Sequence, residues 1–73
     1  MSTLVSARLK ECRVLKNAKH REAAEAVGVT LGTYQRYESG DREPSLAVLS
    51  KIADYYNVSI DYLLGRSDSF ERQ

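Results

Sequence analysis

Few residues of this 73-residue sequence have the types and spacing that catalysis or metal binding needs. One histidine, His20, and one cysteine, Cys12, do not make the set of ligands that a zinc site requires. The sequence contains no Gly-rich phosphate loop, and its Ser, His and Asp residues are scattered without a nucleophile motif. We therefore expect no enzyme activity, no catalytic residues, no metal and no cofactor. The single cysteine cannot form an internal disulfide, which favours a reducing, cytoplasmic location.

Basic side chains are the groups whose spacing suggests a binding function. The formal net charge is only +1, yet the segment from Arg8 to Arg21 holds six basic residues and the single acid Glu11, a local net charge of +5. The rest of the sequence carries −4. Such a molecule can present its basic end to a polyanion and keep its acidic end away from it. On charge alone, a lysine-rich helix with a solvated face remains the alternative.

The periodicity of apolar residues predicts five helices and no strands, so the expected fold class is all-α. The expected helices cover residues 4–16, 20–27, 31–38, 46–56 and 60–64. Their ends are marked by residues suited to stopping or capping a helix: Gly28, Gly40 and Gly65 at the stops, and Thr30, Ser45 and Ser59 at the starts. We expect one domain over residues 1–68 and a short polar tail at 69–73, with fraying from Arg66 onward.

A chain of this length has room for one small core. Helical spacing predicts that the core consists of Val5, Leu9, Cys12, Leu15, Ala24, Val27, Val29, Tyr34, Leu46, Leu49, Ile52, Ala53, Tyr56, Val58, Ile60 and Leu63. No run approaches the roughly 18 apolar residues of a membrane span, and mixed charge follows residues 1–6 where a signal peptide would have an apolar segment. We expect a chain that is neither secreted nor anchored to a membrane.

The second and third expected helices are joined closely enough to form a helix-turn-helix. Only three residues separate them. Gly28 suits the turn, Val29 can fill the space between the two helices, and Ala24 is small enough for the helices to cross closely. In such a unit the second helix can enter the major groove of DNA. A helical hairpin in an ordinary bundle would show the same local pattern, so that alternative stays open.

From about Val5 to Asp68 the sequence resembles the lambda-repressor-like, or XRE, family of helix-turn-helix regulators. The resemblance rests on Arg8-Leu9-Lys10-Glu11 with Arg13, Ala24 with Gly28-Val29-Thr30, Arg36-Tyr37-Glu38-Ser39-Gly40, Arg42-Glu43-Pro44-Ser45, Ile52-Ala53, Val58-Ser59 and Asp61-Tyr62-Leu63-Leu64-Gly65. It implies a compact five-helix domain that binds operator DNA, usually as a symmetric dimer, to control transcription. It also implies a partly buried ion pair between Arg13 and Glu38.

A helical wheel of residues 31–38 predicts which side chains can contact base edges. If Tyr34 and Tyr37 face the core, the opposite face carries Gly32, Gln35 and Arg36. Arg36 can bond guanine with two hydrogen bonds and Gln35 can do so with adenine, although a phosphate contact is the alternative for Arg36. The expected base-reading set is Thr30, Leu31, Gly32, Gln35 and Arg36.

Leu31 and Gly32 depart from the polar base readers usual in the resembled family. Leu31 can pack on a thymine methyl group, and Gly32 can let the helix backbone approach DNA closely. The same pair is also compatible with low sequence specificity.

Phosphate contacts are expected from residues that flank the ends of the second and third helices. These are Lys19, His20, Thr33, Ser39, Gly40 through its N–H, and Arg42. His20 stands where the resembled family most often has a glutamine. Because a histidine ordinarily titrates near pH 6.5, we expect DNA affinity to rise between about pH 7.5 and 6. A surface histidine without function is the alternative.

We expect a sequence-specific transcriptional regulator, a repressor, acting on double-stranded DNA in the cytoplasm and associated with the nucleoid. A homodimer through the C-terminal helix would place two third helices in successive major grooves about 34–36 Å apart. The alternative is a helix-turn-helix antitoxin that binds a toxin and its own operator. For either protein contact, the expected surface near the C-terminal end consists of Tyr55, Tyr56, Tyr62, Leu64 and Phe70.

Overall fold

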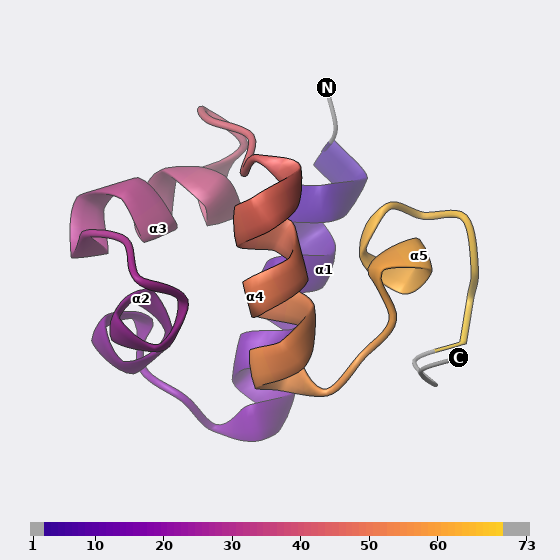
Figure 1. Cartoon of the computed structure of the whole chain (residues 1–73), viewed down its shortest axis with the longest axis horizontal. Helices are drawn as coiled ribbons and strands as arrows, with labels where there is room; N and C mark the ends of the chain where they lie inside the picture. The colour runs from indigo at the N-terminus through magenta and orange to yellow at the C-terminus, as the bar shows by residue number, and fades with distance from the viewer. Residues whose placement is uncertain (1–2, 70–73) are drawn as a thin grey trace.

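The computed structural model describes residues 3–69, which form five helices and contain no strand. The helices are α1 (Thr3–Lys16), α2 (His20–Val27), α3 (Leu31–Ser39), α4 (Leu46–Tyr56) and α5 (Ile60–Leu63). In Figure 1, α4 crosses in front of α1, with α2 and α3 on one side of this pair and α5 on the other. The all-α, five-helix prediction is confirmed, and each helix end lies within one residue of its expected position.

The ends of the helices follow local hydrogen-bond chemistry. The side-chain hydroxyls of Thr30, Ser45 and Ser59 accept backbone N–H bonds at the starts of α3, α4 and α5, as their residue types predict. At the start of α2, the Glu22 carboxylate instead accepts the backbone N–H of Lys19 at 2.8 Å. Gly28 ends α2 in the left-handed conformation, at a φ of 78°, which favours glycine.

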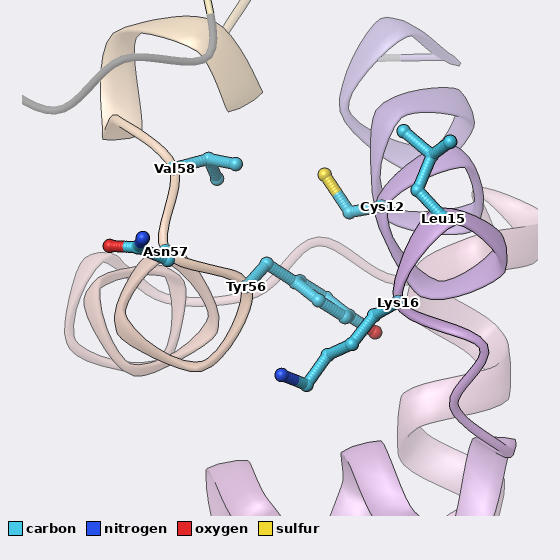
Figure 2. Close-up of a pocket in the computed structure, with 6 residues that line it drawn as sticks. All are labelled: Cys12, Leu15, Lys16, Tyr56, Asn57 and Val58. Atoms are coloured by element: carbon cyan, nitrogen blue, oxygen red, sulfur yellow. The ribbon is translucent and has the colours of Figure 1, made fainter.

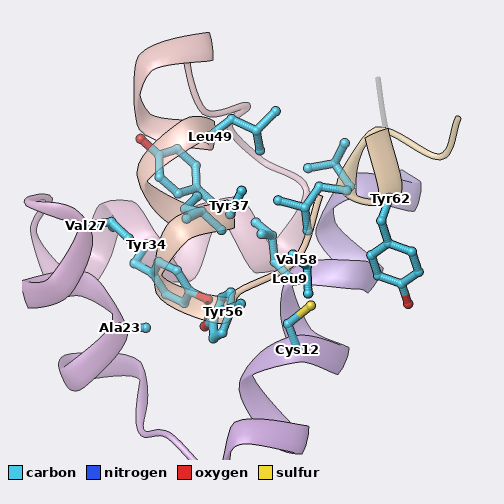
Figure 3. Packing of buried hydrophobic residues seen from close by; sticks show 14 of the residues in the cluster. Leu9, Cys12, Ala23, Val27, Tyr34, Tyr37, Leu49, Tyr56, Val58 and Tyr62 are labelled. Carbon is cyan, nitrogen blue, oxygen red and sulfur yellow. Dashed lines mark hydrogen bonds between the residues drawn. The ribbon is translucent and has the colours of Figure 1, made fainter. Parts of the chain in front are cut away.

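The hydrophobic core joins all five helices (Figure 3). Its buried members are Val5, Leu9, Cys12, Ala23, Ala24, Val27, Tyr34, Tyr37, Leu49, Ile52, Ala53, Tyr56, Val58, Tyr62 and Leu63. Most of the predicted core is confirmed, while Val29 and Ile60 are only partly buried against it. Ala23, Tyr37 and Tyr62 are buried as well. The helical spacing of residues 20–27 and 31–38 turns Ala23 and Tyr37 inward, whereas Tyr62 was expected at a protein-contact surface.

Two core predictions are wrong: Leu15 is 67% exposed and Leu46 is 72% exposed. Leu46 is the first residue of α4, and the first buried residue of that helix is Leu49, nearly one turn later. Leu15 follows Glu11 by one turn of α1, and Tyr62 of α5 bonds to Glu11. The four-residue α5 contacts α1 at Glu11, and Leu15 lies one turn beyond that contact.

The first residues of the tail contact α1, and the expected fraying from Arg66 onward stays a prediction. The Arg8 guanidinium lies 4.0 Å from the centre of the Tyr62 ring and donates to the backbone carbonyls of Tyr62 at 2.5 Å and Ser67 at 2.7 Å. It also lies 3.5 Å from the Asp68 carboxylate. Arg8 thus fastens residues 67–68 to α1. The proposed domain boundary at residue 68 stays a prediction, and Phe70 lies outside the described residues.

None of the described helices combines the length and apolar character needed to cross a membrane.

Candidate nucleic-acid interface

Helices α2 and α3 meet at a turn of the predicted kind. The backbone N–H of Val29 donates to the carbonyl of Ala24 at 3.0 Å, which closes the end of α2 beyond Gly28. Val29 then packs partly buried against the core, and α3 begins after Thr30. The two helices therefore form a helix-turn-helix.

The inner face of α3 is fixed by two buried tyrosines. Tyr34 is fully buried, and its hydroxyl lies 2.5 Å from that of Tyr56 on α4, either of which can donate. The rings of Tyr34 and Tyr37 contact each other edge to face, with centroids 6.3 Å apart. Burial raises the pKa of both hydrogen-bonded phenols, to about 12 for Tyr56, so both remain neutral at physiological pH. Little rotation of α3 about its axis is possible without breaking these contacts.

The structure brings Arg13 and Glu38 together, as the family resemblance implied. The Arg13 Nε donates to Glu38 Oε2 at 2.8 Å, and both side chains are largely buried. This hydrogen bond raises the pKa of Arg13. Arg13 also donates to the carbonyl of Ala18, in the link between α1 and α2. Arg13 of α1 therefore bonds both to α3 and to the link that precedes α2.

His20, at the start of α2, also contacts Glu38. Its Nε2 lies 3.3 Å from Glu38 Oε1, and its side chain is 39% exposed. The imidazole ring also packs edge to face on Tyr34, with centroids 6.3 Å apart. The His20 side chain thus packs against the fold on one side and is exposed to solvent on the other.

The outward face of α3 carries the side chains expected to contact bases. Gly32, Gln35 and Arg36 are exposed, and Leu31 and Thr33 flank them half-buried. Within residues 3–69, the side chains of Gln35 and Arg36 have no hydrogen-bond or ion-pair partner. Their polar ends are therefore available to a ligand.

Thr30 has a structural task in addition to its expected base contact. Its Oγ1 accepts the backbone N–H of Thr33 at 3.2 Å and lies 2.9 Å from the Thr33 hydroxyl, to which it donates. Thr30 therefore caps the start of α3.

Two of the expected phosphate ligands are already bonded within the fold. The Gly40 N–H donates to the carbonyl of Arg36, which closes the last turn of α3. The Ser39 hydroxyl lies 3.1 Å from both the Arg36 carbonyl and the Asp41 carboxylate. At a helix C-terminus the N–H groups point back into the helix, so the sequence-based assignment of Gly40 overlooked a bond that α3 itself requires. Lys19 and Arg42 are exposed.

Part of the basic segment serves the fold and not a ligand, which charge counting could not show. Arg8 and Arg13 bond to α5 and α3, and the Lys16 Nζ lies 4.9 Å from the centre of the Tyr55 ring. Lys19, His20 and Arg21 gather at the N-terminus of α2, where backbone N–H groups point outward. The same segment therefore places two of its remaining basic residues, Lys19 and Arg21, beside the start of the helix-turn-helix, while the third, Lys10, is exposed on α1.

Among residues 3–69, no group of three or more His, Cys, Asp or Glu side chains is placed to hold a metal ion.

The fold and the exposed α3 define a lambda-repressor-like helix-turn-helix domain. A family model described as helix-turn-helix matches residues 9–63, and the chain belongs to this family, in its XRE branch. Members of the family are DNA-binding transcriptional regulators and not enzymes.

Several relatives support this membership. The HTH-type transcriptional regulator AnsR of Bacillus subtilis is 44% identical over 59 residues, which cover 81% of this chain and 51% of AnsR. The cryptic phage CTXphi transcriptional repressor RstR of Vibrio cholerae is 38% identical over 69 residues, covering 94% of this chain and 62% of RstR. The HTH-type transcriptional regulator ImmR of Bacillus subtilis is 39% identical over 61 residues, which cover 84% of this chain and 48% of ImmR. The chain thus spans about half the length of the curated relatives it matches.

Proposed function

We propose that this chain is a sequence-specific DNA-binding transcriptional repressor that inserts α3 into the major groove of operator DNA. One observation carries the proposal: α3 is held from inside by Tyr34 and Glu38, while Gln35 and Arg36 project outward without a partner among the described residues. A rigid helix with unsatisfied polar side chains on one face is what base recognition requires.

Each outward residue of α3 has a distinct proposed role. Arg36 bonds a guanine edge with two hydrogen bonds, Gln35 bonds an adenine, and Leu31 packs on a thymine methyl group. Gly32 lets the backbone approach the bases, and Thr30 sets where α3 begins. Specificity would then depend mainly on Arg36 and Gln35.

Phosphate contacts are proposed on either side of α3. Lys19 and His20 lie at the N-terminus of α2, where the helix dipole adds to their attraction for an anion. Thr33 flanks the base-reading face, and Arg42 stands in the loop after α3. Ser39 and Gly40 are left out because both are bonded within the end of α3. These contacts orient the domain on DNA without selecting a sequence.

The names of the relatives favour a regulator over an antitoxin. AnsR and ImmR are named as transcriptional regulators, and RstR is named as a transcriptional repressor. We propose that the chain acts likewise as a repressor, on DNA in the cytoplasm.

We further propose that the repressor binds DNA as a homodimer. Two copies would place their α3 helices in successive major grooves, about 34–36 Å apart. Among the residues in and next to α5, Tyr62 and Leu63 are buried, so a dimer contact there would use Ile60, Asp61 and Leu64.

Selection of bound fragments from random DNA, repeated at two salt concentrations, tests the function. We expect a motif with two half-sites. If Lys19 and Arg42 of both subunits contact phosphates, log affinity should fall with log salt concentration with a slope of about −4. Binding without a motif and with a steep salt slope would contradict sequence-specific recognition.

Two arginine variants separate base contacts from phosphate contacts. Arg36→Ala should cost about 1–3 kcal/mol on the selected motif and relax the preference at one base pair of each half-site. Arg42→Ala should weaken binding to all sequences alike and reduce the steepness of the salt slope by about one for each subunit. A uniform loss with Arg36→Ala would assign Arg36 to a phosphate.

A further inference from the structure

Two tyrosine hydroxyls face each other inside the core of this small domain. Tyr34 of α3 is fully buried, Tyr56 of α4 is 9% exposed, and the hydroxyl oxygens of the two side chains lie 2.5 Å apart (Figure 3). Phenylalanine would fill nearly the same volume at both positions without bringing a polar atom into the core. Packing alone therefore does not explain why both side chains carry a hydroxyl.

The Tyr34 hydroxyl connects the first part of α3 to another helix. Among the described residues, no other side chain of residues 31–36 forms a hydrogen bond or an ion pair with a different helix. The bond between Glu38 and Arg13 lies near the far end of α3. The position of the base-contacting part of α3 thus depends on Tyr34 together with apolar packing.

Packing surrounds Tyr56 less completely than it surrounds Tyr34. Figure 2 shows the Tyr56 ring between α4 and α1, where it lines a pocket of about 370 Å³ together with residues that include Cys12 and Val58. A ring with open space on one side has fewer contacts that resist a shift of its position. The hydrogen bond at the hydroxyl end of Tyr56 therefore fixes the ring where packing does not.

Both hydroxyls keep their protons at physiological pH. Burial raises the pKa of Tyr34 and of Tyr56, the latter to about 12, and the negative charge of Glu38 adds to both shifts. Within residues 3–69, every buried side-chain nitrogen or oxygen has a hydrogen-bond partner. A buried polar network that is satisfied in this way favours one packing arrangement over its alternatives.

A small rotation of α3 would displace the side chains proposed to contact bases. Gln35 and Arg36 directly follow Tyr34 in α3, and both are exposed. Side chains extend about 5–6 Å from the axis of a helix, so a rotation of about 10° moves their ends by about 1 Å. Hydrogen bonds from one side chain to two atoms of a base tolerate a displacement of only about 0.5 Å. The contact that fixes Tyr34 therefore also decides whether Arg36 can form both bonds.

We propose that the Tyr56 hydroxyl is a positioning group for DNA recognition, which holds the Tyr34 hydroxyl and so fixes the orientation in which α3 presents Arg36 to the bases. The proposal rests on the proposed function and adds that a buried residue of α4 controls discrimination between base pairs. The overall attraction for DNA comes from exposed basic side chains and does not depend on this hydroxyl.

The test replaces tyrosine with phenylalanine, which removes the hydroxyl and keeps the ring. Tyr56→Phe leaves the Tyr34 hydroxyl without this partner. The double variant Tyr34→Phe, Tyr56→Phe removes both hydroxyls, so it should regain most of the stability that Tyr56→Phe loses. Tyr55→Phe is the matched control, because Tyr55 precedes Tyr56 in α4 and its hydroxyl forms no hydrogen bond within residues 3–69. Urea denaturation compares the stability of these three variants with that of the wild-type chain.

Fluorescence anisotropy measures binding to three DNAs: the selected motif, the motif changed at the base pair assigned to Arg36, and unrelated DNA. For the double variant, the preference for the selected motif over the changed motif should fall about fivefold or more. Its affinity for unrelated DNA should stay within about twofold of the wild-type value. Amide hydrogen exchange at Gln35 and Arg36 should be about tenfold faster in the double variant, because α3 is held less firmly. Tyr55→Phe should match the wild-type chain in all of these measurements.

A folded double variant that discriminates as well as the wild-type chain would overturn the proposal. Equal losses of affinity on all three DNAs would overturn it too, because the hydroxyls would then serve the fold as a whole and not the orientation of α3. If the double variant does not fold, Tyr56→Phe alone gives the same comparison.

Failure of the proposed function has a different signature. A wild-type chain that prefers no motif would contradict sequence-specific recognition. Faster amide exchange at Gln35 and Arg36 in the double variant would still show, in that case, that the two hydroxyls hold α3, whereas unchanged exchange would show that they do not.

Discussion

At the scale of single residues, the outer face of α3 holds one position that the fold does not explain. Gly32 has ordinary helical backbone geometry, and a Cβ added there would meet nothing within 4 Å. A glycine inside a helix costs about 0.5–1 kcal/mol relative to alanine. The reason for glycine must then lie outside the isolated domain, and close contact of the α3 backbone with bases supplies one.

Gly32→Ala should therefore stabilise the protein and weaken DNA binding. We expect the free energy of unfolding to rise by about 0.5–1 kcal/mol, and operator affinity to fall about fivefold or more because the added methyl group holds α3 away from the bases. Urea denaturation and fluorescence anisotropy with labelled operator measure the two effects. Ser50→Ala, at an exposed position of α4, is the matched control and should leave affinity unchanged. Equal or tighter binding by Gly32→Ala would rule out the close approach.

His20 adds a second prediction at this scale. With its Nε2 directed at Glu38, a neutral imidazole has no proton on Nδ1 to give to a phosphate. A phosphate contact through Nε2 would therefore have to compete with Glu38. If His20 binds a phosphate, His20→Ala should weaken operator binding by about three- to tenfold.

His20→Gln keeps a hydrogen-bond donor, so it should retain more operator affinity than His20→Ala does. Anisotropy titrations at a fixed salt concentration and pH measure the affinities of the three proteins. Equal affinities for the wild-type chain and His20→Ala would show that His20 takes no part in DNA binding.

At the scale of the elements, polar contacts fix the short helices on α1. Glu38 of α3 receives Arg13 from α1 and His20 from α2, while Arg8 and Glu11 of α1 hold α5 through the ring, hydroxyl and carbonyl of Tyr62. A nine-residue helix and a four-residue helix have little stability on their own. Their orientation therefore depends on these anchors together with the core.

Removing one partner of the Arg13–Glu38 pair should lower the free energy of unfolding more than replacing both partners with apolar residues. Arg13→Met leaves a largely buried carboxylate and should lower the free energy of unfolding by about 3 kcal/mol. The double variant Arg13→Met, Glu38→Leu should lose less than Arg13→Met alone, because no buried charge is left. Urea denaturation of four proteins, namely the wild-type chain, Arg13→Met, Glu38→Leu and the double variant, completes the comparison. If the two single losses simply add in the double variant, the pair is not coupled as the geometry indicates.

At the scale of the whole molecule, the stability of the fold depends on buried ionisable side chains, Cys12 and Tyr56, staying neutral. Burial raises the pKa of the Cys12 thiol from 9.0 to about 11, with Glu11 adding to the shift, and burial likewise raises the pKa of Tyr56 to about 12. Both groups have a higher pKa in the folded state than in the unfolded state. Their contribution to stability is therefore complete below pH 9 and is lost as the pH rises through their folded pKa values.

The protein should accordingly lose stability in alkaline solution. Between pH 9 and 11 we expect Cys12 to account for a loss on the order of 2 kcal/mol, since each pH unit carries about 1.4 kcal/mol for one proton. Cys12→Ala should be less stable at every pH, because it removes packed volume, but should show a shallower decline over that interval. Urea unfolding at several pH values provides the measurement. Parallel declines for the two proteins would show that the thiol does not titrate differently on folding.

Features that depend on nearby residues could be predicted from the sequence, whereas features that depend on contacts between distant residues could not. Helix ends were predictable because caps such as Thr30 and the left-handed Gly28 act within a few residues of chain. The outward face of α3 followed from the wheel once Tyr34 and Tyr37 were placed inside. Leu15 was misplaced because the wheel shows a direction but not where the neighbouring α5 ends.

The sequence by itself determined the helix-turn-helix and the overall helical order, since turn chemistry and apolar periodicity are local properties. Only the tertiary structure decided which charged side chains and which hydrogen-bond donors are used within the fold. Arg8 and Arg13, two members of the basic segment, bond to α5 and α3, and the N–H of Gly40 donates to the carbonyl of Arg36 at the end of α3. The physical reason is that a charge or donor becomes available to a ligand only when no group of the fold reaches it first, and that depends on contacts between residues far apart in the chain.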